Sequence, residues 1–214
     1  WLLFAIFHVP DGAFGDAGAD WLGWDIRTGR FRTQPAVAGI DLAAVTAEAR
    51  RYGFHATIKP PFRLAAPQGE DALRDAVASL AARLAPAGCA GLRLGRIGAF
   101  LALVPEGDAA AIGRLAVECV RALDPFRAPA PPEEVARRRS TGLTPAQEGN
   151  LDQWGYPYVM EEFRFHMTLT GSLATALAER VQSAVAPRFE AVLPRPFRLD
   201  TLCLAGEAGD GFFR

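Results

Sequence analysis

The stretch Phe54-His55-Ala56-Thr57-Ile58 recurs later in the chain as Phe165-His166-Met167-Thr168-Leu169. The sequence has 3 histidines among 214 residues, and two of them occupy the same place in the two copies. The copies lie about half a chain apart. This spacing predicts a duplicated module with one copy of the motif in each half.

Each copy alternates apolar and polar residues, as a half-buried β-strand does. Side chains on a strand point to opposite faces with a period of two. The apolar residues of each copy are therefore expected in a core, and the polar residues on the other face. The polar set of the first copy is His55, Thr57 and Lys59, and that of the second is His166, Thr168 and Thr170.

An imidazole beside a hydroxyl is a suitable pair for chemistry on a phosphate. Imidazole gains or loses a proton near neutral pH, and a hydroxyl can donate a hydrogen bond to an anionic oxygen. Two such pairs facing each other predict an acid–base site around one phosphate, with His55, His166, Thr57 and Thr168 as catalytic residues. His8 has no hydroxyl two residues later and is expected to be structural.

His-x-Thr followed by an apolar residue, twice and half a chain apart, resembles the two-histidine (2H) phosphoesterase superfamily. Further stretches are similar to a bacterial branch associated with phosphonate-utilisation operons: 51–63, 100–105, 124–129 and 154–159. The resemblance covers nearly the whole chain. It implies an α+β fold of two pseudo-symmetric lobes, each an antiparallel sheet with flanking helices, around a central cleft. It also implies that each lobe supplies one motif to a site without metal.

Hydrophobic periodicity predicts the same organisation. Helices are expected over about 70–85, 109–123 and 174–186, and strands over 92–97, 99–104 and 197–204. Thr144-Pro145-Ala146-Gln147 has the pattern of a capping box at the start of a helix. We expect a single bilobal domain over residues 1–214, with motifs at 54–58 and 165–169 and a connector at about 125–155.

Arginines are concentrated around this connector: Arg121, Arg127, Arg137, Arg138 and Arg139. Guanidinium suits phosphate because it donates two parallel hydrogen bonds. A solvated helix face is the alternative for this set, and core packing is the alternative for Tyr156. The expected substrate-binding residues are Lys59, which is the only lysine, Thr170, Arg127, Arg138 and Tyr156.

Composition narrows the classes of function. Half of the residues are apolar, 22% are charged, and the net charge of −1 gives no general attraction for a long nucleic acid. Cys89, Cys119 and Cys203 are far apart without C-x-x-C spacing, which argues against disulfides and zinc and favours reduced cytoplasmic thiols. No membrane segment, metal or cofactor is expected.

These observations predict a metal-independent phosphodiesterase that hydrolyses a small cyclic phosphate. The sequence has no Gly-x-Ser-x-Gly elbow and no His-Glu-x-x-His helix. The resemblance points to a phosphoribosyl 1,2-cyclic phosphate of phosphonate catabolism as substrate. The alternatives are a 2′,3′-cyclic nucleotide or RNA-end phosphodiesterase, and a non-catalytic protein that binds a phosphorylated sugar or nucleotide. The near-symmetry of the motifs leaves open which histidine is the acid and which is the base.

Overall fold

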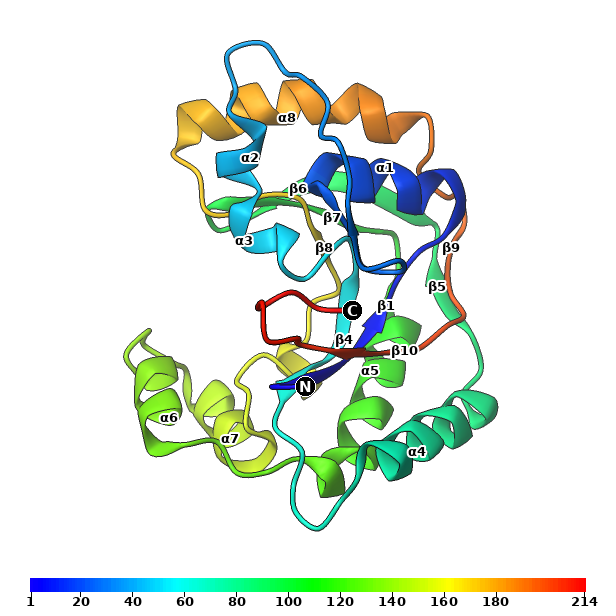
Figure 1. The fold of residues 1–214 in the computed structure, drawn as a ribbon, viewed down its shortest axis with the longest axis vertical. Helices are drawn as coiled ribbons and strands as arrows, with labels where there is room; N and C mark the ends of the chain where they lie inside the picture. Colours follow the sequence, from blue (N-terminus) through cyan, green and yellow to red (C-terminus); the bar gives the residue numbers. More distant parts are fainter.

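One six-stranded antiparallel sheet forms the centre of the protein in the computed structural model, which describes residues 1–214 (Figure 1). In order across the sheet, the strands are β10 (Cys203–Gly206), β1 (Phe4–His8), β4 (Ala56–Phe62), β8 (Met167–Thr168), β7 (Phe100–Glu106) and β6 (Gly91–Ile97). The two motif strands, β4 and β8, are therefore neighbours in the middle of the sheet.

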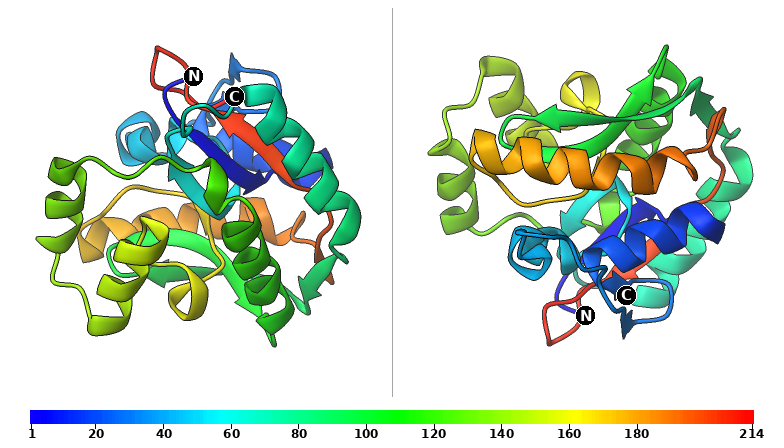
Figure 2. Two further views of the ribbon diagram at one scale, coloured as in Figure 1. Left: turned by 90° about the horizontal axis from the view of Figure 1, so that it is seen from below. Right: turned by 90° about the horizontal axis from the view of Figure 1, so that it is seen from above.

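Four long helices pack against one face of this sheet: α1 (Gly12–Leu22), α4 (Glu70–Arg83), α5 (Ala110–Ala122) and α8 (Thr175–Glu190). Figure 2 shows α1 with α8 from above and α4 with α5 from below. Their apolar residues join a core of 33 buried residues that includes Ile6, Ala56 and Met167 from the sheet. The motif strands are thus held by burial of their apolar alternate residues, as the sequence pattern predicts.

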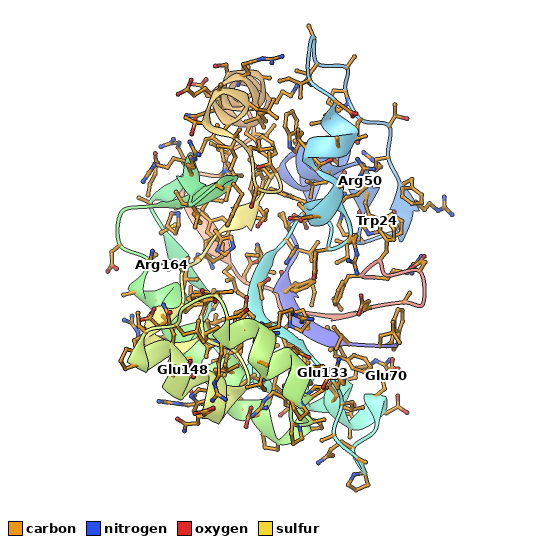
Figure 3. The ribbon with its side chains drawn as sticks, turned by 90° about the vertical axis from the view of Figure 1, so that its left-hand side faces the viewer. Trp24, Arg50, Glu70, Glu133, Glu148 and Arg164 are labelled. Carbon is orange, nitrogen blue, oxygen red and sulfur yellow. The ribbon has the colours of Figure 1, made fainter.

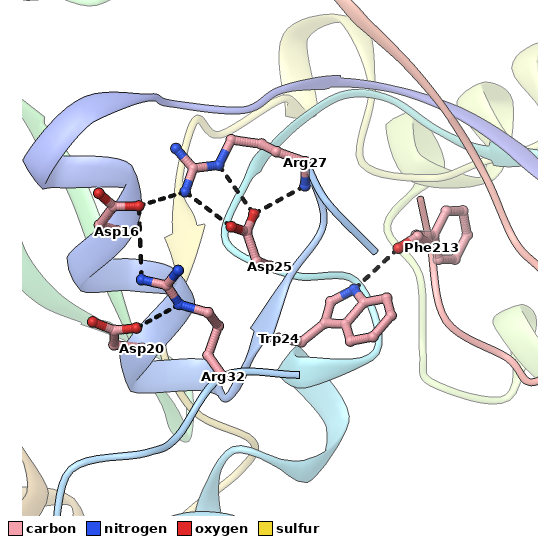
Figure 4. Close-up of polar contacts among 7 residues, drawn as sticks. All are labelled: Asp16, Asp20, Trp24, Asp25, Arg27, Arg32 and Phe213. Carbon is pink, nitrogen blue, oxygen red and sulfur yellow. Dashed lines mark hydrogen bonds and ion pairs between the residues drawn. The ribbon is translucent and has the colours of Figure 1, made fainter. Parts of the chain in front are cut away.

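A smaller core lies on the other side of β1. It contains Phe7 from β1, Trp24 from β2 (Trp24–Asp25) and Phe213 from the C-terminal segment. The indole of Trp24 donates a hydrogen bond of 3.1 Å to the carbonyl of Phe213, and Arg27 binds the Asp25 carboxylate beside it (Figure 4). β2 pairs with β3 (Arg30–Phe31), and the N–H of Phe213 donates a hydrogen bond to the carbonyl of Arg51, shortly before the first motif.

The connector forms two helices, α6 (Pro132–Arg139) and α7 (Pro145–Trp154), which lie side by side in Figure 3, where Glu133 and Glu148 mark them. Arg139 joins them, with Nε 2.9 Å from Glu148 and Nη2 2.6 Å from Asp152. The capping box predicted at the start of α7 is present. The other elements are short: α2 (Leu42–Val45), α3 (Ala47–Arg50), β5 (Ala87–Cys89), β9 (Phe197–Leu199), η1 (Asp124–Phe126) and η2 (Met160–Glu162).

The predicted α+β class is confirmed, with differences in detail. The strands form one continuous sheet and not one sheet per lobe; the division into two lobes and the single domain stay predictions. The helix expected to stop at Pro187 continues to Glu190 because Val185 and Phe189, on either side of the proline, are buried in the core. The strand expected over 197–204 is two strands, β9 and β10, in different sheets. No helix combines the length and apolar character needed to cross a bilayer.

Candidate functional site

The pairing of β4 with β8 brings the polar residues of both motifs together. Ala56 pairs with Met167 in antiparallel register, and both side chains are buried in the core. Neighbouring residues point to the opposite face, so His55 lies across from Thr168, and Thr57 lies across from His166. Residues opposite each other on paired strands have Cβ atoms about 4.5–5.5 Å apart. The four predicted catalytic side chains therefore form one cluster on one face.

The two imidazoles are held in the same way. Nδ1 of His55 lies 2.9 Å from the carbonyl oxygen of Gly53, and Nδ1 of His166 lies 2.8 Å from that of Arg164. A carbonyl can only accept, so each Nδ1 carries the proton, and each Nε2 is the nitrogen that changes its protonation state. The carbonyl is two residues before the histidine in both copies, which is a structural counterpart of the sequence repeat.

Gly53 is required for this arrangement by its backbone. Its φ of +71° is in the left-handed region, which favours glycine. A Cβ at this position would also lie 2.7 Å from Cβ of Ile26. The sharp turn before the first motif directs the carbonyl of Gly53 to the His55 ring.

Aromatic rings lie around His55, and burial of its imidazole lowers its pKa. The ring centroid of Phe7 is 3.9 Å from that of His55, and the ring of Tyr52 is 6.0 Å away. Burial lowers the pKa of His55 to about 4, and nearby His166 lowers it further against the opposing effect of the Gly53 carbonyl. His55 is therefore neutral at pH 7. Its Nε2 lies 3.0 Å from the hydroxyl of Thr57, which can donate to it.

His166 has a less enclosed position than His55. Its ring is 5.7 Å from that of Phe100, and its hydrogen bond to the carbonyl of Arg164 is exposed. A cavity of about 220 Å³ opens at the cluster and is lined by His55 and Thr168 together with Tyr52 and Phe100. The space beside the imidazoles can hold a small anion.

Helix α1 supports both motif strands. Gly18 lets the ring of Phe54 pack directly on the helix, because a Cβ on Gly18 would lie 1.9 Å from Cδ1 of that ring. The indole of Trp21 donates a hydrogen bond of 2.9 Å to the carbonyl of Leu169, at the end of the second motif. One helix thus fixes the two copies relative to each other.

Lys59 does not lie on the His55 face, so that prediction is wrong. Thr57 pairs with Phe7 of β1, whereas Lys59 pairs with Ile6, and this shift in register marks a β-bulge at Ile58. The bulge turns Lys59 into the core, where Nζ donates a hydrogen bond of 3.2 Å to the carbonyl of Val120. Burial lowers the pKa of the Lys59 amine to about 8, against the opposing effect of a nearby carboxylate.

Thr170 lies beside the same cavity, but its hydroxyl is used inside the protein. It accepts a hydrogen bond of 3.0 Å from the backbone N–H of Leu101 and donates one of 2.8 Å to the carbonyl of Gly171. The residue is fully buried. Thr170 therefore joins β8 to β7, and its hydroxyl is not available to a ligand in this arrangement.

The connector residues are mainly engaged with one another. Arg127 binds the Asp124 carboxylate at 2.7 Å, and Arg138 binds that of Glu134 at 2.7 Å. The guanidinium of Arg138 also lies 4.6 Å from the centroid of the Tyr156 ring, and burial raises the pKa of that phenol. The structure brings Arg138 and Tyr156 together and places Arg127 beside Asp124, the partner of the buried Lys59.

Sequence reasoning missed the groups that enclose and orient the imidazoles. Tyr52 and Gly53 immediately precede the first motif, and the glycine could have indicated a turn there. Phe7 lies in a strand whose residues are all buried, so alternation along β1 carries no information about its face. No group of three or more His, Cys, Asp or Glu side chains is gathered where it could hold a metal ion.

Comparison with known proteins gives three results. Residues 57–214 match the family described as "Protein of unknown function (DUF1045)". A protein of Janthinobacterium sp. (strain Marseille) named ribose 1,5-bisphosphate phosphokinase PhnN is 37% identical over 217 residues, which cover 97% of this chain and 48% of the relative. A protein of the same name from Laribacter hongkongensis (strain HLHK9) is 33% identical over 211 residues, with 98% and 50% covered. No solved structure matches.

The chain spans about half the length of the curated relatives that it matches. The family match itself covers well over half of this chain, from Thr57 of the first motif through the whole second motif to the C-terminal residue. The chain therefore belongs to the DUF1045 family.

Proposed function

We propose that the protein is a metal-independent phosphodiesterase that opens a small cyclic phosphate. The observation that carries this proposal is the matched pair of imidazoles on one face of β4 and β8, each with Nδ1 bound to a carbonyl two residues earlier. A buried structural histidine needs no such counterpart. Two imidazoles in one cluster, with a cavity at His55 and Thr168, suit a reaction that takes up one proton and releases another.

The pKa of His55 suggests how the roles are divided. Because burial keeps His55 neutral at pH 7, its Nε2 is unprotonated and free to act as the base, and it takes a proton from the attacking water. The water oxygen forms a bond to phosphorus, the bond from phosphorus to one ring oxygen breaks, and His166 gives its proton to that departing oxygen. When substrate binds, the Thr57 hydroxyl turns from Nε2 of His55 to the phosphate, and Thr57 and Thr168 donate hydrogen bonds to the non-bridging oxygens, where negative charge increases. A proton transfer of this kind contributes roughly 10²- to 10⁴-fold to the rate.

The names of the relatives support a sugar phosphate as substrate. They are kinases of ribose 1,5-bisphosphate, and this chain corresponds to about half of each. Addition of water to a 5-phosphoribosyl 1,2-cyclic phosphate, with cleavage of the bond from phosphorus to O2, yields ribose 1,5-bisphosphate. The proposed product is thus the compound in the relatives' name, which agrees with the phosphonate branch that the sequence resembles.

The direct test follows ³¹P NMR signals of 5-phosphoribosyl 1,2-cyclic phosphate and of 2′,3′-cyclic nucleotides with purified protein. His55→Ala and His166→Ala should each abolish turnover while circular dichroism stays native. His8→Gln is the matched control, because His8 hydrogen-bonds the Thr201 carbonyl and lies outside the motif pair. Full turnover by either folded motif variant would refute the two-histidine mechanism.

Metal dependence and simple binding are tested with the same substrates. Activity should survive exhaustive treatment with EDTA; loss that one divalent ion restores would assign the protein to the metal hydrolases. Binding of a cyclic phosphate without turnover at any pH, with affinity that only rises as the pH falls, would instead identify a phosphate-binding protein.

A further inference from the structure

A second, larger cavity of about 610 Å³ adjoins the second motif. It lies between strands β6 and β7, the start of α5 and the segment 160–165 that leads into His166. Its charged lining consists of Arg93, Arg96, Glu161 and Arg164. Figure 3 shows Arg164 beside the β6–β7 hairpin, which is drawn in green.

The strand register places Arg93 in line with His166. Ala102 of β7 pairs with Thr168 of β8, so Val104 lies across from His166 on the face of the motif cluster. Val104 in turn pairs with Arg93 of β6. Arg93, Val104 and His166 therefore form one row across three neighbouring strands, on one face of the sheet.

The next set of paired residues across these strands includes two small ones, Gly95 and Ala102, and Ala102 is fully buried. Gly95 pairs with Ala102, and Ala102 pairs with Thr168. His55 lies across from Thr168 on the neighbouring strand β4. A Cβ on Gly95 would lie 3.7 Å from Nη1 of Arg93, so the guanidinium lies close to Gly95. With strands about 4.8 Å apart, the backbones at Arg93 and His166 are roughly 10 Å apart, and Val104, which lies between them, also lines the cavity.

Arg93 and Arg164 form no ion pair with a carboxylate, although Glu161 also lines the cavity. The arginines that pair with carboxylates are elsewhere, and they include the connector residues Arg127 and Arg138. Arg96 is engaged with the carbonyl of Gly98. Arg93 and Arg164 are thus two guanidinium groups that line a cavity without an ion pair.

The backbone of this segment is unusual at the same place. Met160, which lines the cavity, has a φ of +55° and is the one non-glycine residue in the left-handed region. Such a conformation is strained for a residue with a side chain and is concentrated at active sites and ligand-binding sites. It adds to the observation that the segment before His166 is shaped around the cavity.

We propose that Arg93 and Arg164 bind a second, non-reacting phosphate group of the substrate, while the reacting cyclic phosphate lies at His55 and His166. This inference rests on the proposed function and adds a specificity site to it. The substrate class is a sugar with a cyclic phosphate at one end and a phosphate monoester at the other, and the sugar lies beside Val104, between His166 and Arg93. The connector arginines, which the sequence favoured, are not part of this site.

The test compares two substrates that differ only in the distal phosphate: 5-phosphoribosyl 1,2-cyclic phosphate and ribosyl 1,2-cyclic phosphate. Arg93→Ala should lower kcat/KM for the first by about 10- to 100-fold, because it removes a charge-assisted hydrogen bond. It should leave kcat/KM for the second within about twofold. Arg114→Ala is the matched control, since Arg114 is exposed on α5 and does not line the cavity; it should change neither value.

A steric variant provides an independent measurement. Val104→Phe places a larger side chain between Arg93 and His166 and should weaken binding of ribose 5-phosphate, measured by calorimetry, as Arg93→Ala should. Equal loss of kcat/KM on both substrates in Arg93→Ala, or no loss on either, would overturn the proposed site.

Failure of the proposed function would give a different result. If the wild-type protein hydrolyses neither cyclic phosphate, calorimetry with ribose 5-phosphate still decides the site. Binding that Arg93→Ala weakens about tenfold or more, and that Arg114→Ala does not, supports the phosphate site alone. No binding, or binding equal in wild type and Arg93→Ala, overturns it.

Discussion

The low pKa of His55 makes a quantitative prediction for activity in acid. With a pKa of about 4, about 97% of His55 is neutral at pH 5.5, whereas an imidazole with an ordinary pKa of about 6.5 would be about 9% neutral. If neutral His55 is the base, kcat/KM at pH 5.5 should keep nearly its full value instead of falling about tenfold. The acidic limb of the profile should then lie near pH 4, because kcat/KM reports groups of the free enzyme.

The assay uses ribosyl 1,2-cyclic phosphate, because a phosphate monoester titrates near pH 6 and would distort the profile. NMR of the imidazole resonances of His55, assigned by comparison with His55→Ala, measures the pKa directly. Phe7→Ala should raise this pKa towards 6.5 by admitting water to the ring that Phe7 now covers at 3.9 Å. His166→Asn should raise it less, since burial is the larger cause.

Each measurement can refute the reasoning. An imidazole of His55 that titrates near 6.5 in the wild type would show that the Phe7 and Tyr52 rings do not desolvate it. A pKa that is low by NMR, together with a kcat/KM profile that falls near pH 6.5, would show that His55 is not the base.

Five further substitutions test the site and its support. Thr168→Val should lower kcat with little change in stability. Thr170→Val should lower the free energy of unfolding by about 1–3 kcal/mol, because it leaves a buried N–H without its acceptor. Equal stability of the two variants in urea unfolding would contradict this expectation. Gly18→Ala should be destabilised by about 1–3 kcal/mol through overpacking at the first motif, while Gly149→Ala, with open space around its Cβ in α7, should be slightly more stable. Lys59→Met should keep kcat/KM within about twofold, since its amine bonds the Val120 carbonyl in the core; a large loss of activity in the folded variant would return Lys59 to the site.

The sequence predicted the motif cluster well because strand alternation is a local property. The alternation of apolar and polar residues within each motif was enough to assign His55, Thr57, His166 and Thr168 to one face. The pairing of Ala56 with Met167 is consistent with that assignment. The same rule failed two residues later at Lys59. The bulge at Ile58 depends on how β4 pairs with β1, and no residue within the motif indicates that a bulge is present.

The charges of the site were harder to predict for a different reason. An arginine is available to a ligand only if no nearby carboxylate neutralises it, and this depends on the fold. Glu134 and Arg138 are four residues apart, so their pairing on a helix could have been anticipated from spacing. Arg93 becomes relevant only through the register of three strands, which connects it to His166 although the two are far apart in sequence.

The central position of β4 and β8 has a consequence for how two similar motifs could take different roles. Two identical subunits that met at such a seam would place two histidines on a symmetry axis, and symmetry would give both the same affinity for a proton. In a single chain the two sides can differ: Phe7 covers the ring of His55, while the corresponding side of His166 faces Phe100 at a greater distance. Covalent linkage of the halves therefore lets burial lower the proton affinity of the His55 imidazole without imposing the same environment on its counterpart, whereas an equivalent pair differs only by splitting its titration.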